Sequence, residues 1–206
     1  MALVVSGDPR VWILLPTYNG ARFVAEQIAS IQQQTITDWR LLVRDDRSTD
    51  GVTGIVDRLA ASDARIERLA DAPVNAGVVA NVSELMATAQ RRGARRVMLA
   101  DQDDVWLPQK IAVSLERLQQ AEAADGDRPI LVHTDLTVVD DQLRVLAPSF
   151  LHYQRKRHEA VDPLATLLVT NFVTGCTTLF NERLLRLAAP VPSARDASTS
   201  SALPTR

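Results

Sequence analysis

The chain has 206 residues, a length that suits a single domain with a sizeable core. Its hydrophobic content of 46% and charged content of 23% are ordinary for a globular protein, and the net charge of −2 gives no electrostatic basis for nucleic acid as a partner. The single cysteine excludes an internal disulfide framework and fits a reducing compartment. No signal-peptide pattern and no apolar window of membrane-spanning length are found, so the sequence predicts a cytoplasmic protein.

Short apolar runs alternate with amphipathic segments along the chain. The predicted strands cover residues 11–15, 39–44, 65–69, 97–100 and 129–134. One helix is predicted after Asn19, which would be its N-cap, and a second follows the turn at 48–51. A third has Val78, Val82, Leu85 and Ala89 on one face, and a fourth begins near Pro108. This alternation indicates an α/β fold with three layers and a mostly parallel central sheet.

Three carboxylates follow the predicted buried strand at 97–100. Asp101, Asp103 and Asp104 stand where open α/β sheets bind ligands, at the carboxyl end of a strand. Carboxylates one residue apart can share Mg²⁺ or Mn²⁺ and the diphosphate that the cation carries, because these cations prefer hard oxygen ligands. The alternative is a solvated acidic turn before the next helix.

The ends of two earlier strands are also polar, at residues 16–19 (PTYN) and 45–46 (DD). Together with the acidic strand end they place a stacking aromatic, hydrogen-bonding carboxylates and metal ligands on one rim of the sheet. Neither a dinucleotide-binding glycine fingerprint nor a phosphate-binding Gly-Lys-Ser/Thr loop is present. A nucleoside diphosphate held through a cation fits this combination.

The segments PTYNG (16–20), VRDDRSTD (43–50), NAGVVAN (75–81) and LADQDDVWLPQK (99–110) occur in an order that resembles glycosyltransferase family 2, in particular its bacterial rhamnosyltransferase-like members. The resemblance covers roughly residues 10–190 and implies a Rossmann-like GT-A fold. It implies one domain over 1–192, with a nucleotide-sugar-binding half at 10–135 and a partial acceptor half at 136–192. Arg47 stands where the family often has glycine, which bears on the local turn.

The resemblance also implies roles for individual residues. The residues implied to bind the nucleotide sugar are Pro16, Thr17, Tyr18, Asn19, Asp46, Asn75, Gly77, Asp101 and Asp103. Thr17 and Tyr18 would line the nucleobase pocket, and Asp46 would form a hydrogen bond to the nucleobase. Asp101 would face the ribose or the diphosphate, and Asp103 would coordinate the metal. Simpler alternatives remain for two of them: Tyr18 as an ordinary strand-end aromatic, and Asp46 as the cap of the following helix. The catalytic base is not identified.

The implied reaction is an inverting sugar transfer with Mg²⁺ or Mn²⁺ as cofactor. The donor is a nucleotide sugar such as dTDP-rhamnose, and the acceptor is a glycan or lipid-linked molecule in cell-surface polysaccharide synthesis. Such an acceptor implies peripheral contact with the inner face of the membrane. Residues 193–206 are expected to be a disordered tail of a truncated or frameshifted terminus, which leaves a catalytically impaired nucleotide-sugar-binding protein as the alternative function. A nucleotidyltransferase is disfavoured because no basic, glycine-rich loop follows the first strand.

Several other side chains are interpreted structurally. Trp106 is expected to pack beneath the acidic loop, His133 to be a satisfied core histidine, and Cys176, in the segment 171–180, to be a small buried residue near the acceptor rather than a nucleophile. The arginines 91, 92, 95 and 96 are expected to be solvated. The basic run 155–158 is interpreted as a plain surface loop, with contact to an anionic acceptor or the membrane face as the alternative.

Overall fold

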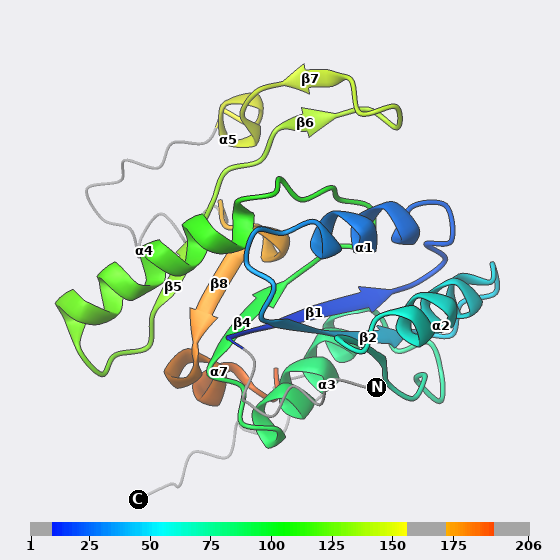
Figure 1. Ribbon diagram of the computed structural model, residues 1–206, viewed down its shortest axis with the longest axis horizontal. Coiled ribbons are helices and arrows are strands. Elements are labelled where there is room, and N and C mark those ends of the chain that lie inside the picture. Colours follow the sequence, from blue (N-terminus) through cyan, green and yellow to red (C-terminus); the bar gives the residue numbers. More distant parts are fainter. Residues whose placement is uncertain (1–9, 156–171, 192–206) are drawn as a thin grey trace, which may run out of the picture.

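The computed structural model describes residues 10–155 and 172–191. Its first elements are β1 (Val11–Thr17), α1 (Val24–Gln32), β2 (Trp39–Asp45), α2 (Val52–Ser62), β3 (Ile66–Arg68), α3 (Val78–Arg91), β4 (Arg96–Leu99) and α4 (Lys110–Asp125) (Figure 1). They are followed by β5 (Leu131–His133), β6 (Val138–Val139), β7 (Val145–Ala147), α5 (Phe150–Tyr153), the 3₁₀ turn η1 (Gly175–Thr177), β8 (Thr178–Asn181) and α7 (Glu182–Ala188).

Most strands belong to one sheet of order β3-β2-β1-β4-β8-β5. β1 pairs in parallel with β2 and β4, and β2 pairs in parallel with β3. β8 lies between β4 and β5 and is antiparallel to both. The predicted mostly parallel α/β sheet is therefore confirmed. β8 itself was not predicted, because its four residues, TLFN, carry no alternation long enough to distinguish a strand.

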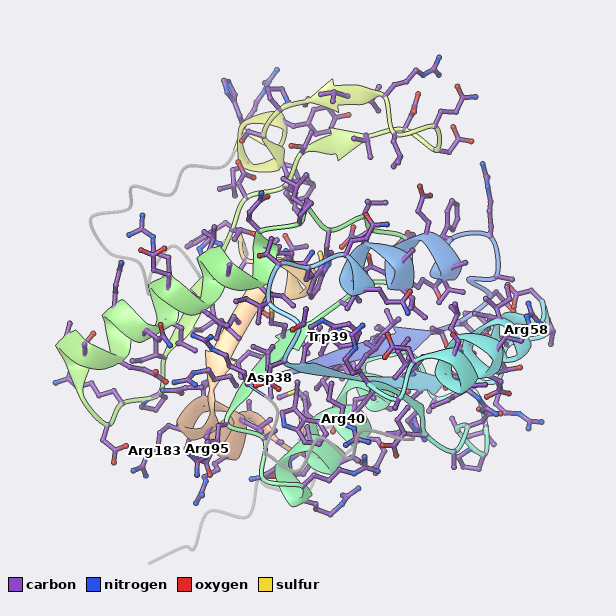
Figure 2. All side chains as sticks on the ribbon, viewed as in Figure 1. Asp38, Trp39, Arg40, Arg58, Arg95 and Arg183 are labelled. Atoms are coloured by element: carbon purple, nitrogen blue, oxygen red, sulfur yellow. The ribbon has the colours of Figure 1, made fainter. Side chains whose placement is uncertain are left out.

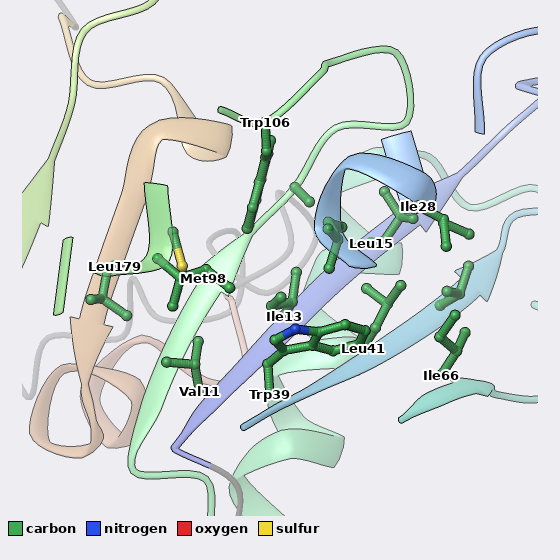
Figure 3. Packing of buried hydrophobic residues seen from close by; sticks show 14 of the residues in the cluster. Val11, Ile13, Leu15, Ile28, Trp39, Leu41, Ile66, Met98, Trp106 and Leu179 are labelled. Carbon is green, nitrogen blue, oxygen red and sulfur yellow. The ribbon is translucent and has the colours of Figure 1, made fainter. Parts of the chain in front are cut away.

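Helices cover both faces of the sheet, which gives the predicted three layers. Successive residues of β1 point to opposite faces, and both faces are buried, so its apolar run is continuous. Val11, Ile13 and Leu15 join one core cluster with α1, α2 and α4 (Figure 3). Trp12 and Leu14 join a second cluster with α3 and α7.

Details of three predicted helices need correction. Asn19 does not cap α1, whose N-cap is Phe23 without a side-chain bond. Val78 lies outside the buried face of α3, since it is 64% exposed, whereas Leu85 and Ala89 are buried. α4 begins at Lys110 rather than at Pro108.

The hairpin of β6 and β7 and the short helix α5 lie beside the sheet rather than in it (Figure 1). An ion pair of 2.7 Å between Arg22 and Asp141 connects the hairpin to the segment before α1. The predicted acceptor half, 136–192, is described only in part, and the tail predicted at 193–206 lies outside the described residues. Within the described ranges, no helix combines the length and apolar character needed to cross a membrane.

Candidate functional site

The carboxyl ends of β1, β2 and β4 lie side by side, because Thr17 is in register with Asp45, and Leu14 with Leu99. A cavity of about 520 Å³ opens there, which we call the strand-end cavity. It is lined by Pro16, Thr17, Tyr18, Asp46, Asn75, Gly77, Val78, Asn81, Asp101, Gln102 and Asp103. Every binding residue predicted from the sequence therefore lines it, except Asn19.

Asp45 organises the floor of this region without lining the cavity. Its carboxylate is buried and accepts hydrogen bonds from the Thr17 hydroxyl (2.9 Å), the Ser48 hydroxyl (2.6 Å) and the Ser48 backbone N–H (2.7 Å). A buried carboxylate satisfied by several donors is a fixed structural element. Asp45 thereby joins the end of β1 to the loop after β2.

Asp46 connects the same loop to the start of α3. One carboxylate oxygen accepts from the Ala76 N–H at 2.9 Å and the other from the Gly77 N–H at 2.8 Å. The Asn75 side chain donates to the Asp46 carbonyl at 3.2 Å. The alternative that Asp46 caps the following helix, α2, is wrong: the N-cap there is Gly51, and no side chain bonds to it as a cap.

Asn19 has a supporting position behind the cavity. Its N–H donates to the Ser48 hydroxyl at 2.8 Å, and its side-chain oxygen accepts from the Thr49 N–H at 3.0 Å. Both Asn19 (φ 48°) and Arg47 (φ 68°) adopt left-handed backbone conformations. Asparagine tolerates this region better than arginine does, so Arg47 keeps the turn geometry that glycine would adopt without strain.

Tyr18 is the aromatic side chain of the cavity. It is 51% exposed, so it is not an ordinary strand-end aromatic packed into the core. An exposed ring at a cavity wall is available for stacking on a planar ligand.

The acidic loop after β4 divides its carboxylates between two environments. Asp101 and Asp103 line the strand-end cavity, whereas Asp104 does not. Although Asp101 as a residue is exposed, protein crowds its carboxyl group, and this burial together with the charge of Asp103 raises its pKa. Burial, followed by the charges of Asp101 and Asp103, also raises the pKa of Asp104.

Cys176 in η1 lies against this loop. Its thiol donates to the carboxylates of Asp101 and Asp104, and the ligand atoms of the three residues lie within 4.8 Å of one another. Burial and the two negative charges raise the pKa of the Cys176 thiol. A buried, protonated thiol is a poor nucleophile, in agreement with the structural role predicted for this residue.

Asp103 and Asp101 fit the requirements of a hard divalent cation. Both residues line the cavity, and no hydrogen bond or ion pair joins Asp103 to another residue in the described ranges. A carboxylate without a protein partner at a cavity suits Mg²⁺ or Mn²⁺, and a second carboxylate two residues away can complete the oxygen ligands. Asp104 does not line the cavity and is therefore less available to a ligand there.

Three lining residues were not predicted from the sequence: Val78, Asn81 and Gln102. The sequence pattern places Val78 on the inward face of a helix. Asn81 is a buried partner of Arg44, with bonds of 2.9 and 3.0 Å between them. Gln102 stands between two predicted ligands, so its position next to the cavity could have been inferred.

Two further aromatic residues lie near the loop. Trp106 is 4% exposed within the core, as predicted, and its backbone N–H donates to the Ser30 hydroxyl at 2.9 Å. His133 is half-buried rather than part of the core, with its ring centroid 5.9 Å from that of Phe172.

Arginines gather at another cavity of about 460 Å³, whose lining includes Arg95, Arg96 and Arg183. Figure 2 shows Arg95 and Arg183 near each other beside α7. The prediction that the arginines around Gly93 are solvated is confirmed for Arg91, Arg92 and Arg95, which are exposed, whereas Arg96 is partly buried. Arg92 forms an ion pair with Glu67, Arg91 with Glu84 and Arg96 with Glu122. Of the basic run 155–158, only Arg155 lies within the described residues.

The family model described as glycosyl transferase family 2 matches residues 12–185. The putative teichuronic acid biosynthesis glycosyltransferase TuaG of Bacillus subtilis is 26% identical over 176 residues, which are 85% of this chain and 68% of TuaG. The glucosyltransferase WfgD of Escherichia coli, named for UDP-Glc and α-D-GlcNAc-diphosphoundecaprenol, is 30% identical over 54% of this chain and 42% of its own. The dTDP-rhamnosyl transferase RfbG of Shigella flexneri is 29% identical over 50% of this chain and 36% of its own. The chain thus spans less than half the length of the last two.

Among solved structures, the mannosyltransferase PcManGT of Pyrobaculum calidifontis, in complex with GDP-Man and Mn²⁺, matches with a TM-score of 0.58 at 22% identity. The match covers 89% of this chain and 48% of that protein. The likeness confirms the predicted GT-A fold.

Proposed function

This chain belongs to glycosyl transferase family 2, and on that premise we propose that it transfers a sugar from a nucleoside-diphosphate sugar to an acceptor hydroxyl. The observation that carries the proposal is the convergence of three strand ends and the 75–77 loop on one cavity. That cavity combines an exposed aromatic ring, loops held by hydrogen bonds to buried carboxylates, and Asp103, a carboxylate without a partner in the described residues. A nucleoside diphosphate needs each of these features.

The base side of the site is formed by the ends of β1 and β2. Tyr18 stacks on the nucleobase, with Pro16 and Thr17 beside it, since these residues line the same wall. Each carboxylate oxygen of Asp46 accepts one backbone N–H and keeps a further lone pair, so it can also accept from a nucleobase N–H. Asn75 and Gly77 hold the loop beside the nucleotide.

The diphosphate side is formed by the acidic loop. Asp101 faces the ribose or the diphosphate, and Asp103 holds Mg²⁺ or Mn²⁺. The cation, when bound, neutralises the charge that develops on the leaving diphosphate. The acceptor hydroxyl attacks the anomeric carbon from the face opposite the diphosphate, which inverts the configuration, and a carboxylate base takes its proton. No described residue is assigned to that base.

The names of the relatives support a narrower proposal for substrates. RfbG is named as a dTDP-rhamnosyl transferase, WfgD for a diphosphoundecaprenol acceptor and TuaG for teichuronic acid biosynthesis. We infer that the acceptor here is a glycan or lipid-linked intermediate of a cell-surface polysaccharide, with dTDP-rhamnose among the donors to be tried. An acceptor of this kind places the protein at the inner face of the membrane.

Titration calorimetry with UDP, dTDP and GDP tests the proposal. At least one should bind in the presence of Mn²⁺ and bind much more weakly in excess chelator. Asp103→Asn should weaken this binding by about tenfold or more, because a charged ligand of the cation is lost. Asp104→Asn should weaken it less, and Glu116→Gln, on the exposed side of α4, should leave it unchanged.

Equal affinity in Mn²⁺ and in chelator would refute the assignment of the metal to Asp103. Failure of all three nucleotides to bind would refute the proposed function itself. Tight binding of nucleotide sugars without hydrolysis or transfer, across a panel of acceptors, would instead support the alternative of a catalytically impaired nucleotide-sugar-binding protein.

A further inference from the structure

The side chain of Gln102 pairs with the backbone of Tyr18 across the strand-end cavity. The Tyr18 N–H donates to Gln102 Oε1 at 3.0 Å, and Gln102 Nε2 donates to the Tyr18 carbonyl at 3.0 Å. The two residues are 84 positions apart in the sequence. A primary amide offers a donor and an acceptor together, so it can pair with both backbone groups of one residue, as a neighbouring strand would.

Gly20 provides the space for this pairing. A Cβ atom at Gly20 would lie 2.1 Å from Gln102 Oε1 and 2.4 Å from its Cδ, far inside van der Waals contact. Gly20 does not adopt a positive φ, so a backbone conformation reserved for glycine does not explain it. The residue is therefore small because the amide of Gln102 lies where its side chain would be.

The pairing continues the contact between β1 and β4 beyond the end of their ladder. The last backbone bond of the ladder runs from the Ala100 N–H to the Leu14 carbonyl at 2.9 Å. After it, the chain from β1 leads to Tyr18 on the base side, and the chain from β4 leads to Asp101 and Asp103 on the diphosphate side. The amide of Gln102 spans the two chains at the point where they separate.

We propose that Gln102 is a positioning residue, whose amide fixes the spacing between Tyr18 and the carboxylates of Asp101 and Asp103 before the donor binds. This inference rests on the proposed function. Its physical basis is preorganisation: a ligand that contacts both sides gains affinity when their separation is set in advance. A ligand that contacts the base side alone gains nothing from that spacing.

The test compares a nucleoside diphosphate with its monophosphate. The probe is whichever of UDP, dTDP and GDP the wild-type protein binds in Mn²⁺, with the corresponding monophosphate. Gln102→Ala should lower the affinity for the diphosphate by about tenfold and the affinity for the monophosphate by less than about twofold. Gln120→Ala, an exposed glutamine on α4, is the matched control and should change neither affinity.

Gly20→Ala provides an independent second variant, because its new Cβ should displace the amide. Alone, it should weaken the diphosphate to the same extent as Gln102→Ala. In the Gln102→Ala background it should have no further effect, since the amide is already gone. Thermal melting of each variant shows whether the fold is retained, and the ratio of the two affinities does not depend on a uniform loss of folded protein.

Equal weakening of diphosphate and monophosphate, unchanged diphosphate affinity in Gln102→Ala, or additive effects of the two substitutions would each overturn the inference while leaving the proposed function intact. A wild-type protein that binds none of the three diphosphates would overturn both.

Discussion

In the six-stranded sheet, Val11, Ile13 and Leu15 of β1 are fully buried, whereas no residue from 134 to 155, the region of the hairpin and α5, is buried at all. The hairpin of β6 and β7 exposes Val145 and Leu146 by 64% and 62%. The sheet therefore gains its stability from apolar burial, and the hairpin has little of that contribution. An isolated two-stranded hairpin is marginal in water.

Polar contacts also connect the sheet's loops more extensively than they connect the hairpin. The loops around the strand-end cavity are connected by two buried carboxylates: Asp45 accepts bonds from Thr17 and Ser48, and Asp46 accepts bonds from Ala76 and Gly77. The connection from the hairpin to the segment before α1 is an exposed ion pair, Arg22–Asp141. The comparison indicates that the proposed donor side is held rigid by its own contacts, whereas the hairpin can change its conformation when a ligand or partner contacts it.

Removing buried apolar volume from the sheet should produce the largest effect. Leu41 lies in the centre of β2 and is fully buried, so Leu41→Ala should lower the free energy of unfolding by about 2–5 kcal/mol. Leu146→Ala makes the same chemical change in the hairpin, at a side chain already in solvent, and should cost less than about 0.5 kcal/mol. Urea unfolding of both variants measures the difference. Similar losses in the two would break the comparison, because they would show that the hairpin residue is buried in solution.

The sheet and the cavity were largely predictable from the sequence because their signals are local. Continuous apolar runs such as 11–15 mark strands buried on both faces, and polar residues directly after them mark a rim where parallel strands end together. The positions of Thr17, Asp46 and Asp103 followed from that rule without any knowledge of side-chain contacts.

Contacts between distant segments were not predictable in this way. The sequence offered a nucleobase or the adjacent helix as partners of Asp46, but its carboxylate reaches the backbone of Ala76 and Gly77, partners that only the packing of α3 supplies. Gln102 shows the same limit, since its partner Tyr18 is 84 residues away. β8 was missed because four residues define no period.

An intermediate effect is expected from Asp63, at the end of α2. It accepts bonds from the Arg65 side chain at 2.7 and 2.9 Å and from Gln32 at 3.0 Å, and Arg65 also stacks over Trp39, 3.9 Å from the ring centroid. The bonds from Arg65 lower the pKa of Asp63 to about 2. A lowered pKa in the folded state means that the ionised carboxylate stabilises the fold above the unfolded pKa, and that this contribution is lost as the pH falls toward 2.

Asp63→Asn should therefore lower the free energy of unfolding by up to about 2 kcal/mol at pH 7, and by progressively less as the pH falls from about 4 to about 2. Denaturant unfolding at several pH values measures both the loss at pH 7 and its decrease at lower pH. Asp38→Asn, an exposed carboxylate just before β2, is the matched control. A difference between Asp63→Asn and wild type that stays constant with pH would contradict the ion-pair account and attribute the loss to packing.

The smallest effect on stability is expected at the contact between the hairpin and the segment before α1. Arg22 and Asp141 are 65% and 54% exposed at the side chain, and an ion pair in such a setting contributes less than about 0.5 kcal/mol. Asp141→Asn should therefore leave unfolding unchanged. Its neighbour Asp140 has a different role: its carboxylate accepts from the backbone N–H groups of Gln142 (2.9 Å) and Arg144 (3.0 Å), which closes the turn from within.

Hydrogen exchange distinguishes the two carboxylates. Asp140→Ala should speed exchange of the hairpin amides, because the turn loses two backbone hydrogen bonds and the ion pair with Arg144 that this carboxylate makes, while the amides of β1 and β2 stay protected. Asp141→Asn should leave both sets unchanged, and so should 0.5 M salt, which screens the ion pair. Faster hairpin exchange in Asp141→Asn would mean that the stability of the hairpin depends on its contact with Arg22. It would then be held by the segment that leads into α1, and the two regions could not be treated as separate in stability.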